Sequence, residues 1–155
     1  MARKNVMVFI EFDGGRIADV SLELVCEAKR LADRLGVRVE AAAAGWGKKD
    51  LLPLLGQYGC NRVFYTDDPR LACFSSLPYA EIIAGIIEKY QPQIVLYGAT
   101  TQGRDIAPRV ASKLRCGLTA DCTQLQIGSH RIKDRDYEDI LLQIRPAFGG
   151  NIIAT

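Results

Sequence analysis

The sequence predicts an α/β fold, with a mostly parallel sheet, helices on both faces and a β-hairpin extension at the C-terminal end. Three observations lead to this fold class. Apolar, β-like runs alternate with helical segments as far as Leu114, 48% of the 155 residues are apolar and 25% are charged, and about the last forty residues change to strand-like segments. Strands that alternate with helices at this spacing are joined by right-handed crossovers, which produce a parallel sheet.

The first strand and the first long helix are the clearest elements. Residues 5–12 are an almost continuous apolar run, which is typical of a strand buried on both faces. Residues 13–15, Asp-Gly-Gly, follow this run and favour a hairpin-like turn over a nucleotide-binding loop. Apolar residues then recur about every 3.6 positions from Leu24 to Leu35. That helix is expected to end at Gly36, because glycine tolerates a positive φ.

The alternation continues through the middle of the chain. Three further apolar, β-compatible runs predict three more strands, at residues 37–44, 62–66 and 94–97. Residues 50–58 predict a short helix, with Pro53 in its first turn, where a proline is tolerated. The apolar face that extends from Tyr79 to Tyr90 predicts a longer helix, which Ser75 or Ser76 is placed to cap.

The last part of the chain changes character. Residues 118–127 and 140–145 predict two strands, and residues 128–130, Gly-Ser-His, predict the turn of a hairpin between them. Residues 151–155 resemble a strand that has only begun when the sequence ends. We therefore expect residues 1–155 to be a single N-terminal domain and the front part of a longer protein.

Composition and charge exclude several classes of function. The net charge is only +2, which gives no electrostatic basis for general nucleic-acid binding. The sequence has neither an apolar run long enough to cross a membrane nor a signal-peptide core at its N-terminus. Five cysteines without a C-x-x-C pair and a single histidine make a metal site unexpected. We expect reduced, mostly buried thiols and a cytoplasmic location.

The most ligand-like segment is the loop of residues 98–104, which joins the fourth strand to a helix expected at about residues 105–114, with Pro108 in its opening turn. In an open α/β sheet, ligands bind beyond the carboxyl ends of the strands, near helix N-termini. The glycines of this loop allow a ligand to approach closely, Thr100 and Thr101 offer hydroxyls, and Arg104 suits a phosphate or carboxylate. The same residues equally suit a tight turn with an N-cap threonine and a paired arginine.

No catalytic centre is evident. The sequence has no G-x-G-x-x-G after the first strand and no G-x-x-x-x-G-K-[ST] motif. His130 is the only histidine, so a Ser-His-Asp triad would need partners that are distant in the sequence. The residues taken alone indicate binding or assembly rather than catalysis.

Three stretches carry a family resemblance. GATTQGRDIAPRVASKLRCGLTADCTQL (residues 98–125), KNVMVFIEFDGGRIADVSLEL near the N-terminus and RPAFGGNIIAT (residues 145–155) resemble the N-terminal domain, domain I, of the electron transfer flavoprotein alpha subunit. The resemblance covers essentially the whole chain in order. It implies a Rossmann-like fold related to the adenine nucleotide alpha hydrolases, in a scaffold domain that pairs with a homologous beta subunit.

The resemblance also implies a place in electron transport. The heterodimer carries electrons from acyl-CoA or other dehydrogenases to a membrane quinone reductase or similar acceptor, and bifurcating relatives use NADH and two flavins. FAD is held mainly by a C-terminal domain whose motifs are absent from residues 1–155, so this segment is expected to bind none firmly. It is expected to have no catalytic centre of its own and to enter no membrane.

The resemblance leaves two roles open for the glycine-containing loop. In the related beta subunit the corresponding region helps to bind AMP or a second flavin, whereas the alpha domain lacks that nucleotide. Thr100, Thr101, Gly103 and Arg104 are therefore candidates for cofactor binding whose alternative role is to shape the face against the beta subunit. A different function, a free-standing adenine-nucleotide-binding module of the universal-stress type, also agrees with the α/β pattern and this loop.

Overall fold

The computed structural model describes residues 4–146 and 153–154. They belong to two compact units, Met1–Leu118 and Thr119–Thr155. In the first unit four strands form a parallel sheet in the order β5-β4-β1-β6. These strands are β1 (Val6–Phe9), β4 (Val39–Gly45), β5 (Arg62–Asp67) and β6 (Ile94–Leu96). The expected parallel α/β fold is confirmed.

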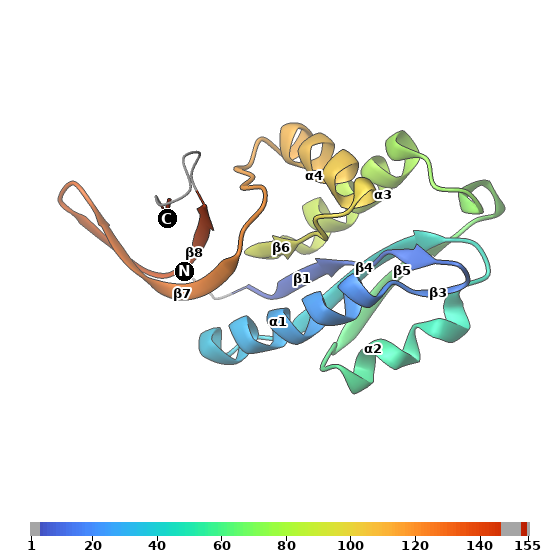
Figure 1. Ribbon diagram of the computed structural model, residues 1–155, viewed down its shortest axis with the longest axis horizontal. Helices are drawn as coiled ribbons and strands as arrows, with labels where there is room; N and C mark the ends of the chain where they lie inside the picture. Colours follow the sequence, from blue (N-terminus) through green and yellow to red (C-terminus); the bar gives the residue numbers. More distant parts are fainter. Residues whose placement is uncertain (1–3, 147–152, 155) are drawn as a thin grey trace. The chain divides into compact units, whose positions relative to one another are not determined.

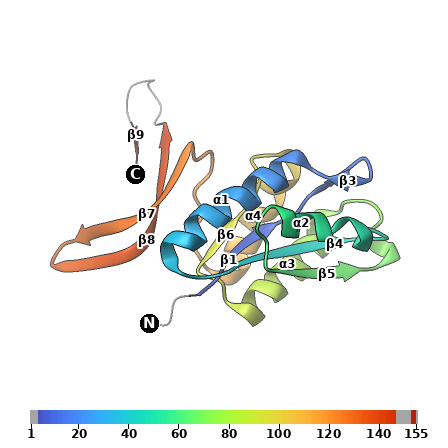
Figure 2. The ribbon, with the colours of Figure 1, turned by 90° about the horizontal axis from the view of Figure 1, so that it is seen from below.

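Helices cover both faces of this sheet (Figures 1 and 2). α1 (Asp19–Leu35) and α2 (Pro53–Gln57) lie on one face, and α3 (Ser76–Tyr90) and α4 (Thr101–Leu114) lie on the other. Two short 3₁₀ turns, η1 (Lys49–Leu51) and η2 (Pro69–Leu71), complete the connections. This distribution is what right-handed crossovers produce when the chain moves outward in one direction from β1 and later returns to its other side.

The core is built on the two central strands. Every residue of β1 and of β4 is buried, as expected for parallel strands covered on both faces. In β4 the run Ala41–Ala44 presents only methyl groups, so helices on both sides can pack closely against it. On the α3 and α4 face, Phe9, Ile83 and Ile106 belong to one apolar cluster and are almost completely buried.

Two local predictions of the first unit are confirmed. The segment after β1 folds into a small hairpin of β2 (Phe12–Asp13) and β3 (Arg16–Ile17), with Gly14 and Gly15 at positive φ in the turn between them. Helix α1 ends at Gly36, which has a φ of 67° and donates its backbone N–H to the preceding turn. Both turns depend on a left-handed conformation that glycine adopts without steric cost.

The boundaries of α3 and α4 differ from expectation. Ser75 is the N-cap residue of α3, but its side chain makes no capping hydrogen bond; Ser76 instead donates its hydroxyl to Asp105. Helix α4 begins at Thr101 rather than near residue 105, because the Thr100 side chain caps it. Pro108 therefore lies inside the helix and not in its opening turn. Its ring removes one backbone donor from the helix.

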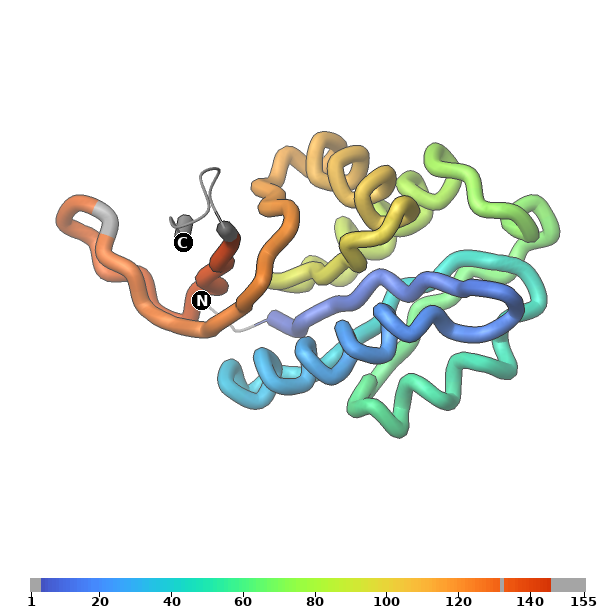
Figure 3. Tube along the Cα trace, in the orientation of Figure 1, coloured from blue at the N-terminus to red at the C-terminus, as the bar shows by residue number. Residues whose placement is uncertain are grey.

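The second unit is antiparallel and contains β7 (Gln124–Ile132), β8 (Arg135–Pro146) and β9 (Ile153–Ala154). The expected C-terminal hairpin is confirmed, and β7 and β8 run side by side from the Gln124–Ile144 pair to the Ile132–Arg135 pair (Figure 3). The expected turn at residues 128–130 is wrong, because these residues belong to β7, where a bulge absorbs the irregularity. The chain reverses instead at Lys133 and Asp134, with Lys133 at a φ of 54°. Residues 151, 152 and 155 of the expected final strand lie outside the described residues.

The positions of the cysteines correct the expectation that the thiols are mostly buried. All five cysteines are free, but none is buried: Cys26, Cys73 and Cys116 are exposed, and Cys60 and Cys122 are half-buried. They lie on helix surfaces and in connections instead of in the sheet, so an apolar sequence context did not imply burial. Within the described ranges, no helix combines the length and the apolar character needed to cross a membrane.

Candidate functional site

The candidate site lies where the strand order reverses. β6 and β4 flank β1 on opposite sides, and the carboxyl ends of β1 and β6 therefore form the switch point at which ligands bind in open α/β sheets. The loop expected at residues 98–104 is divided by the structure: residues 98–100 leave β6, and residues 101–104 form the first turn of α4. β1 contributes Glu11, which follows it by two residues.

Glu11 is the central group of this site. Its side chain and backbone are only 5% exposed. Its backbone N–H donates to Ser21 Oγ over 2.8 Å, and its carbonyl accepts from Ala18 N over 2.9 Å. These contacts to the start of α1 hold Glu11 in place and leave its carboxylate directed at the β6–α4 connection.

A relay of two hydrogen bonds joins this carboxylate to α4. Gly103 N donates to Thr100 Oγ1 over 2.9 Å, and Thr100 Oγ1 donates to Glu11 Oε2 over 2.7 Å. One hydroxyl thus caps the helix and binds the buried carboxylate at the same time. The positive end of the helix dipole adds a favourable environment for the negative charge.

The two glycines of the site, Gly98 and Gly103, allow other parts of the chain to approach their backbone closely. A Cβ placed on Gly103 would lie 2.0 Å from the carbonyl oxygen of Gly98. A Cβ placed on Gly98 would lie 2.7 Å from Glu11 Oε1. Both distances are shorter than any normal contact, so glycine at each position permits the approach of α4 to β6 and of Glu11 to the loop.

The second carboxylate oxygen of Glu11 has unusual surroundings. Oε1 is buried and makes no hydrogen bond to any residue that the structure describes. Burial raises the pKa of Glu11 above its ordinary value of 4.5, and the hydrogen bond from Thr100 opposes part of that rise. Ionisation of a carboxylate in this position has a high desolvation cost. The periodicity of the sequence does not explain why a glutamate stands here.

Glu11 gives the folded protein a specific pH dependence. Because its pKa is raised by folding, its contribution to stability is fully present below the unfolded pKa near 4.5 and is lost as pH rises through the folded pKa. Glu11→Gln removes this titration while keeping the shape. We expect the variant to become progressively more stable relative to wild type as pH rises from about 4.5 through the folded pKa of Glu11, measured by urea unfolding at each pH. A stability difference that stays constant over that range would contradict the burial of an ionising Glu11.

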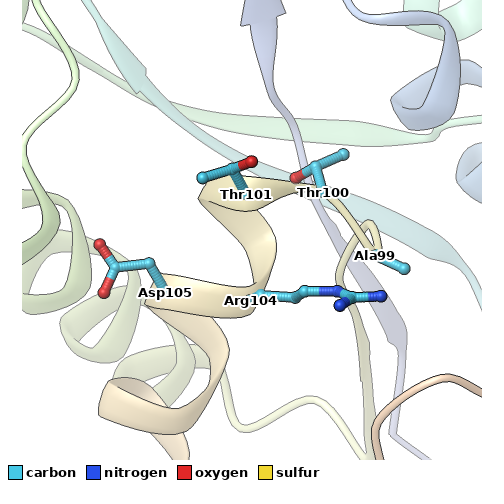
Figure 4. Close-up of a pocket in the computed structure, with 5 residues that line it drawn as sticks. All are labelled: Ala99, Thr100, Thr101, Arg104 and Asp105. Carbon is cyan, nitrogen blue, oxygen red and sulfur yellow. The ribbon is translucent and has the colours of Figure 1, made fainter.

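An open depression of about 510 Å³ lies beside the relay. It is lined by Ala99, Thr100, Thr101, Arg104 and Asp105 (Figure 4). The Arg104 and Asp105 side chains extend in opposite directions from the first turn of α4 (Figure 4). Of the four residues predicted as a site, Thr100, Thr101 and Arg104 share this lining, whereas Gly103 is buried behind it.

Asp105 is hydrogen-bonded to one residue of α3 and to one residue of its own helix. It accepts hydrogen bonds from the Ser76 hydroxyl and from Arg109 Nε, the latter over 2.9 Å. These two donors lower the pKa of Asp105 below its ordinary value. Asp105 therefore remains a carboxylate, paired with Arg109, at the edge of the depression.

The residues of this depression do not fit a flavin. An isoalloxazine ring needs broad apolar or aromatic walls, whereas none of the five lining residues is aromatic and only Ala99 is apolar. The buried carboxylate of Glu11 also opposes a pyrophosphate. Nor do the described residues hold any group of three His, Cys, Asp or Glu side chains that could bind a metal ion.

Glu11 was missed by reasoning from the sequence, although a signal was present. It is the one charged residue within the apolar run of residues 5–12 after Asn5. A carboxylate in a strand that is expected to be buried on both faces requires a partner, because an isolated buried charge is unstable. The sequence alone does not identify Thr100 as that partner.

Comparisons with known proteins agree on one family. A model of the electron transfer flavoprotein domain matches residues 6–155. The electron transfer flavoprotein subunits alpha of Thermoanaerobacterium thermosaccharolyticum and Clostridium acetobutylicum are each 42% identical over 98% of this chain, and the alignments cover 44% and 43% of those relatives. The LctC subunit of a lactate dehydrogenase (NAD(+),ferredoxin) from Acetobacterium woodii is 41% identical over 97% of this chain and 34% of the relative.

The chain therefore spans less than half the length of these relatives. Among solved structures, a universal stress protein in complex with cAMP is similar with a TM-score of 0.44 and 13% identity, over 72% of this chain and 91% of that one.

Proposed function

The chain belongs to the electron transfer flavoprotein alpha-subunit family, and from this premise we propose that it is a scaffold domain that pairs with a beta subunit. The relatives are subunits by name, so a partner chain is the natural complement. The single observation that carries this proposal is the partly exposed apolar surface of the β7–β8 hairpin.

Both faces of this hairpin carry large apolar side chains. Leu125, Ile127 and Leu141 lie on one face, according to the register of the two strands, and Ile140, Leu142 and Ile144 lie on the other. Among the hairpin side chains that the structure describes, none is buried, and these six apolar side chains are half-buried. A two-stranded hairpin has little stability alone in water and needs another strand or surface against its apolar face. Partnership with a second subunit would supply that cover.

The proposed electron transport belongs to the complex rather than to this chain. The heterodimer would carry electrons from acyl-CoA or other dehydrogenases to a quinone reductase or similar acceptor through FAD, with NADH-driven bifurcation as one form of the reaction. We place FAD mainly outside residues 1–155, as the resemblance to the alpha subunit implies. We place the complex in the cytoplasm, where five free thiols would remain reduced.

Association with a beta subunit tests the proposal. Mixing the purified chain with its cognate beta subunit is expected to give a heterodimer by size-exclusion chromatography with light scattering, while the chain alone shows no flavin absorbance. Leu141→Asp places a charge on one apolar face of the hairpin and should weaken the complex by about tenfold or more.

Tyr137→Asp is the matched control, because Tyr137 lies on the same strand, is 41% exposed and is paired with His130 outside the apolar part of the hairpin. It should leave the affinity within about threefold of wild type. A wild-type chain that forms no complex, or equal losses in the two variants, would contradict a role for this surface in assembly.

A further inference from the structure

A buried carboxylate occupies the position at the switch point that suits a ligand's anion. We infer that Glu11 is a built-in substitute for a phosphate group, which closes the anion site at the start of α4 and thereby prevents this chain from binding a nucleotide there. This inference concerns the selectivity of the first unit and does not depend on association with a beta subunit.

The start of α4 has the features of an anion site. The helix is 14 residues long and begins at the carboxyl end of β6, next to β1. Its first amide groups and its dipole attract negative charge, and this is the usual position for phosphate in α/β sheets. Arg104, in the first turn, adds a cation that lines the adjoining depression.

Glu11 uses the same groups that a phosphate would use. The Thr100 hydroxyl, which accepts from Gly103 N, is already donated to Glu11 Oε2. Oε1 fills the space next to Gly98, where even an added methyl group would lie at 2.7 Å. The carboxylate therefore excludes a second anion in two ways, by occupying space and by electrostatic repulsion.

A comparison with the other buried glutamate shows that Glu11 is not held as an ordinary ion pair. Glu40 on β4 is equally buried, at 4% exposed, and its carboxylate faces Arg62 with an Oε1 to Nη1 distance of 3.7 Å. Among the described residues, Glu11 has no such cation and faces a hydroxyl and the amide end of a helix. Those are the surroundings of a bound anion rather than of a salt bridge.

Removal of Glu11 should open the site. Titration of the 155-residue chain with AMP, and separately with inorganic phosphate, is expected by calorimetry to show weak or no binding to wild type. Glu11→Ala should bind AMP at least about tenfold more tightly, because a repelling charge and its volume are removed. Glu40→Ala removes an equally buried charge from a distant position of the sheet and should leave binding unchanged. Adding Arg104→Ala to Glu11→Ala should abolish the gain.

The outcomes separate the possible roles of Glu11. A folded Glu11→Ala that binds AMP no more tightly than Glu40→Ala would overturn the inference, and so would wild-type binding as tight as that of the variant. Circular dichroism establishes whether each variant is folded. If Glu11→Ala does not fold, the isosteric Glu11→Gln decides, measured against Glu40→Gln: a gain in affinity supports the exclusion of anions by charge, and no gain overturns it.

Discussion

Replacing Gly103 with alanine is expected to destabilise the first unit by about 3 kcal/mol or more. The added Cβ would lie 2.0 Å from the carbonyl oxygen of Gly98, and backbone atoms on both sides of that contact cannot rotate away. To relieve the clash, α4 must move from β6 and break the hydrogen bond from Gly103 N to Thr100 Oγ1. Urea unfolding followed by circular dichroism measures the loss as a decrease in the midpoint concentration.

Gly85→Ala is the matched control for this substitution. Gly85 lies inside α3, and a Cβ there would meet nothing within 4 Å. Because alanine has a higher helix propensity than glycine, this change should stabilise the protein by about 0.5 to 1 kcal/mol. If the two alanine variants unfolded at the same urea concentration, close packing between Gly103 and Gly98 would be disproved.

Thr100→Ala is expected to cost about 2 to 4 kcal/mol, the second largest effect. The substitution removes the side-chain cap of α4, and it also removes the donor to Glu11 Oε2. A carboxylate that is only 5% exposed would then lose the partner that stabilises its charge. The loss should be larger at neutral pH than under acidic conditions, because protonation of Glu11 relieves it.

Thr100→Ser separates these contacts from simple packing. Serine keeps the hydroxyl and removes only a methyl group, so we expect a loss below about 1 kcal/mol by the same urea unfolding. A serine variant as unstable as the alanine variant would assign the role of Thr100 to its methyl group and would contradict the hydrogen-bond relay.

The elements of the first unit could be predicted because their signals are local. The apolar periodicity from Leu24 to Leu35 and the glycine at position 36 determine α1 within a few residues of sequence. The position of Pro108 predicts a start for α4 that is about four residues too late, because the Thr100 cap defines the opening turn. Residues 128–130 wrongly suggest the hairpin turn. A glycine can mark a strand bulge as well as a reversal, and Gly128 lies at the bulge of β7.

The α/β class, the family and the segment in which the candidate site lies can all be predicted from the sequence, because each is encoded in short-range patterns or in continuous motifs. The group that occupies the site depends on long-range contacts. Glu11 and Thr100 are 89 positions apart and share a hydrogen bond because β6 pairs with β1. The order of the strands in the sheet determines this pairing. That order depends on how the helices pack on both faces of the sheet, and local sequence patterns do not encode it.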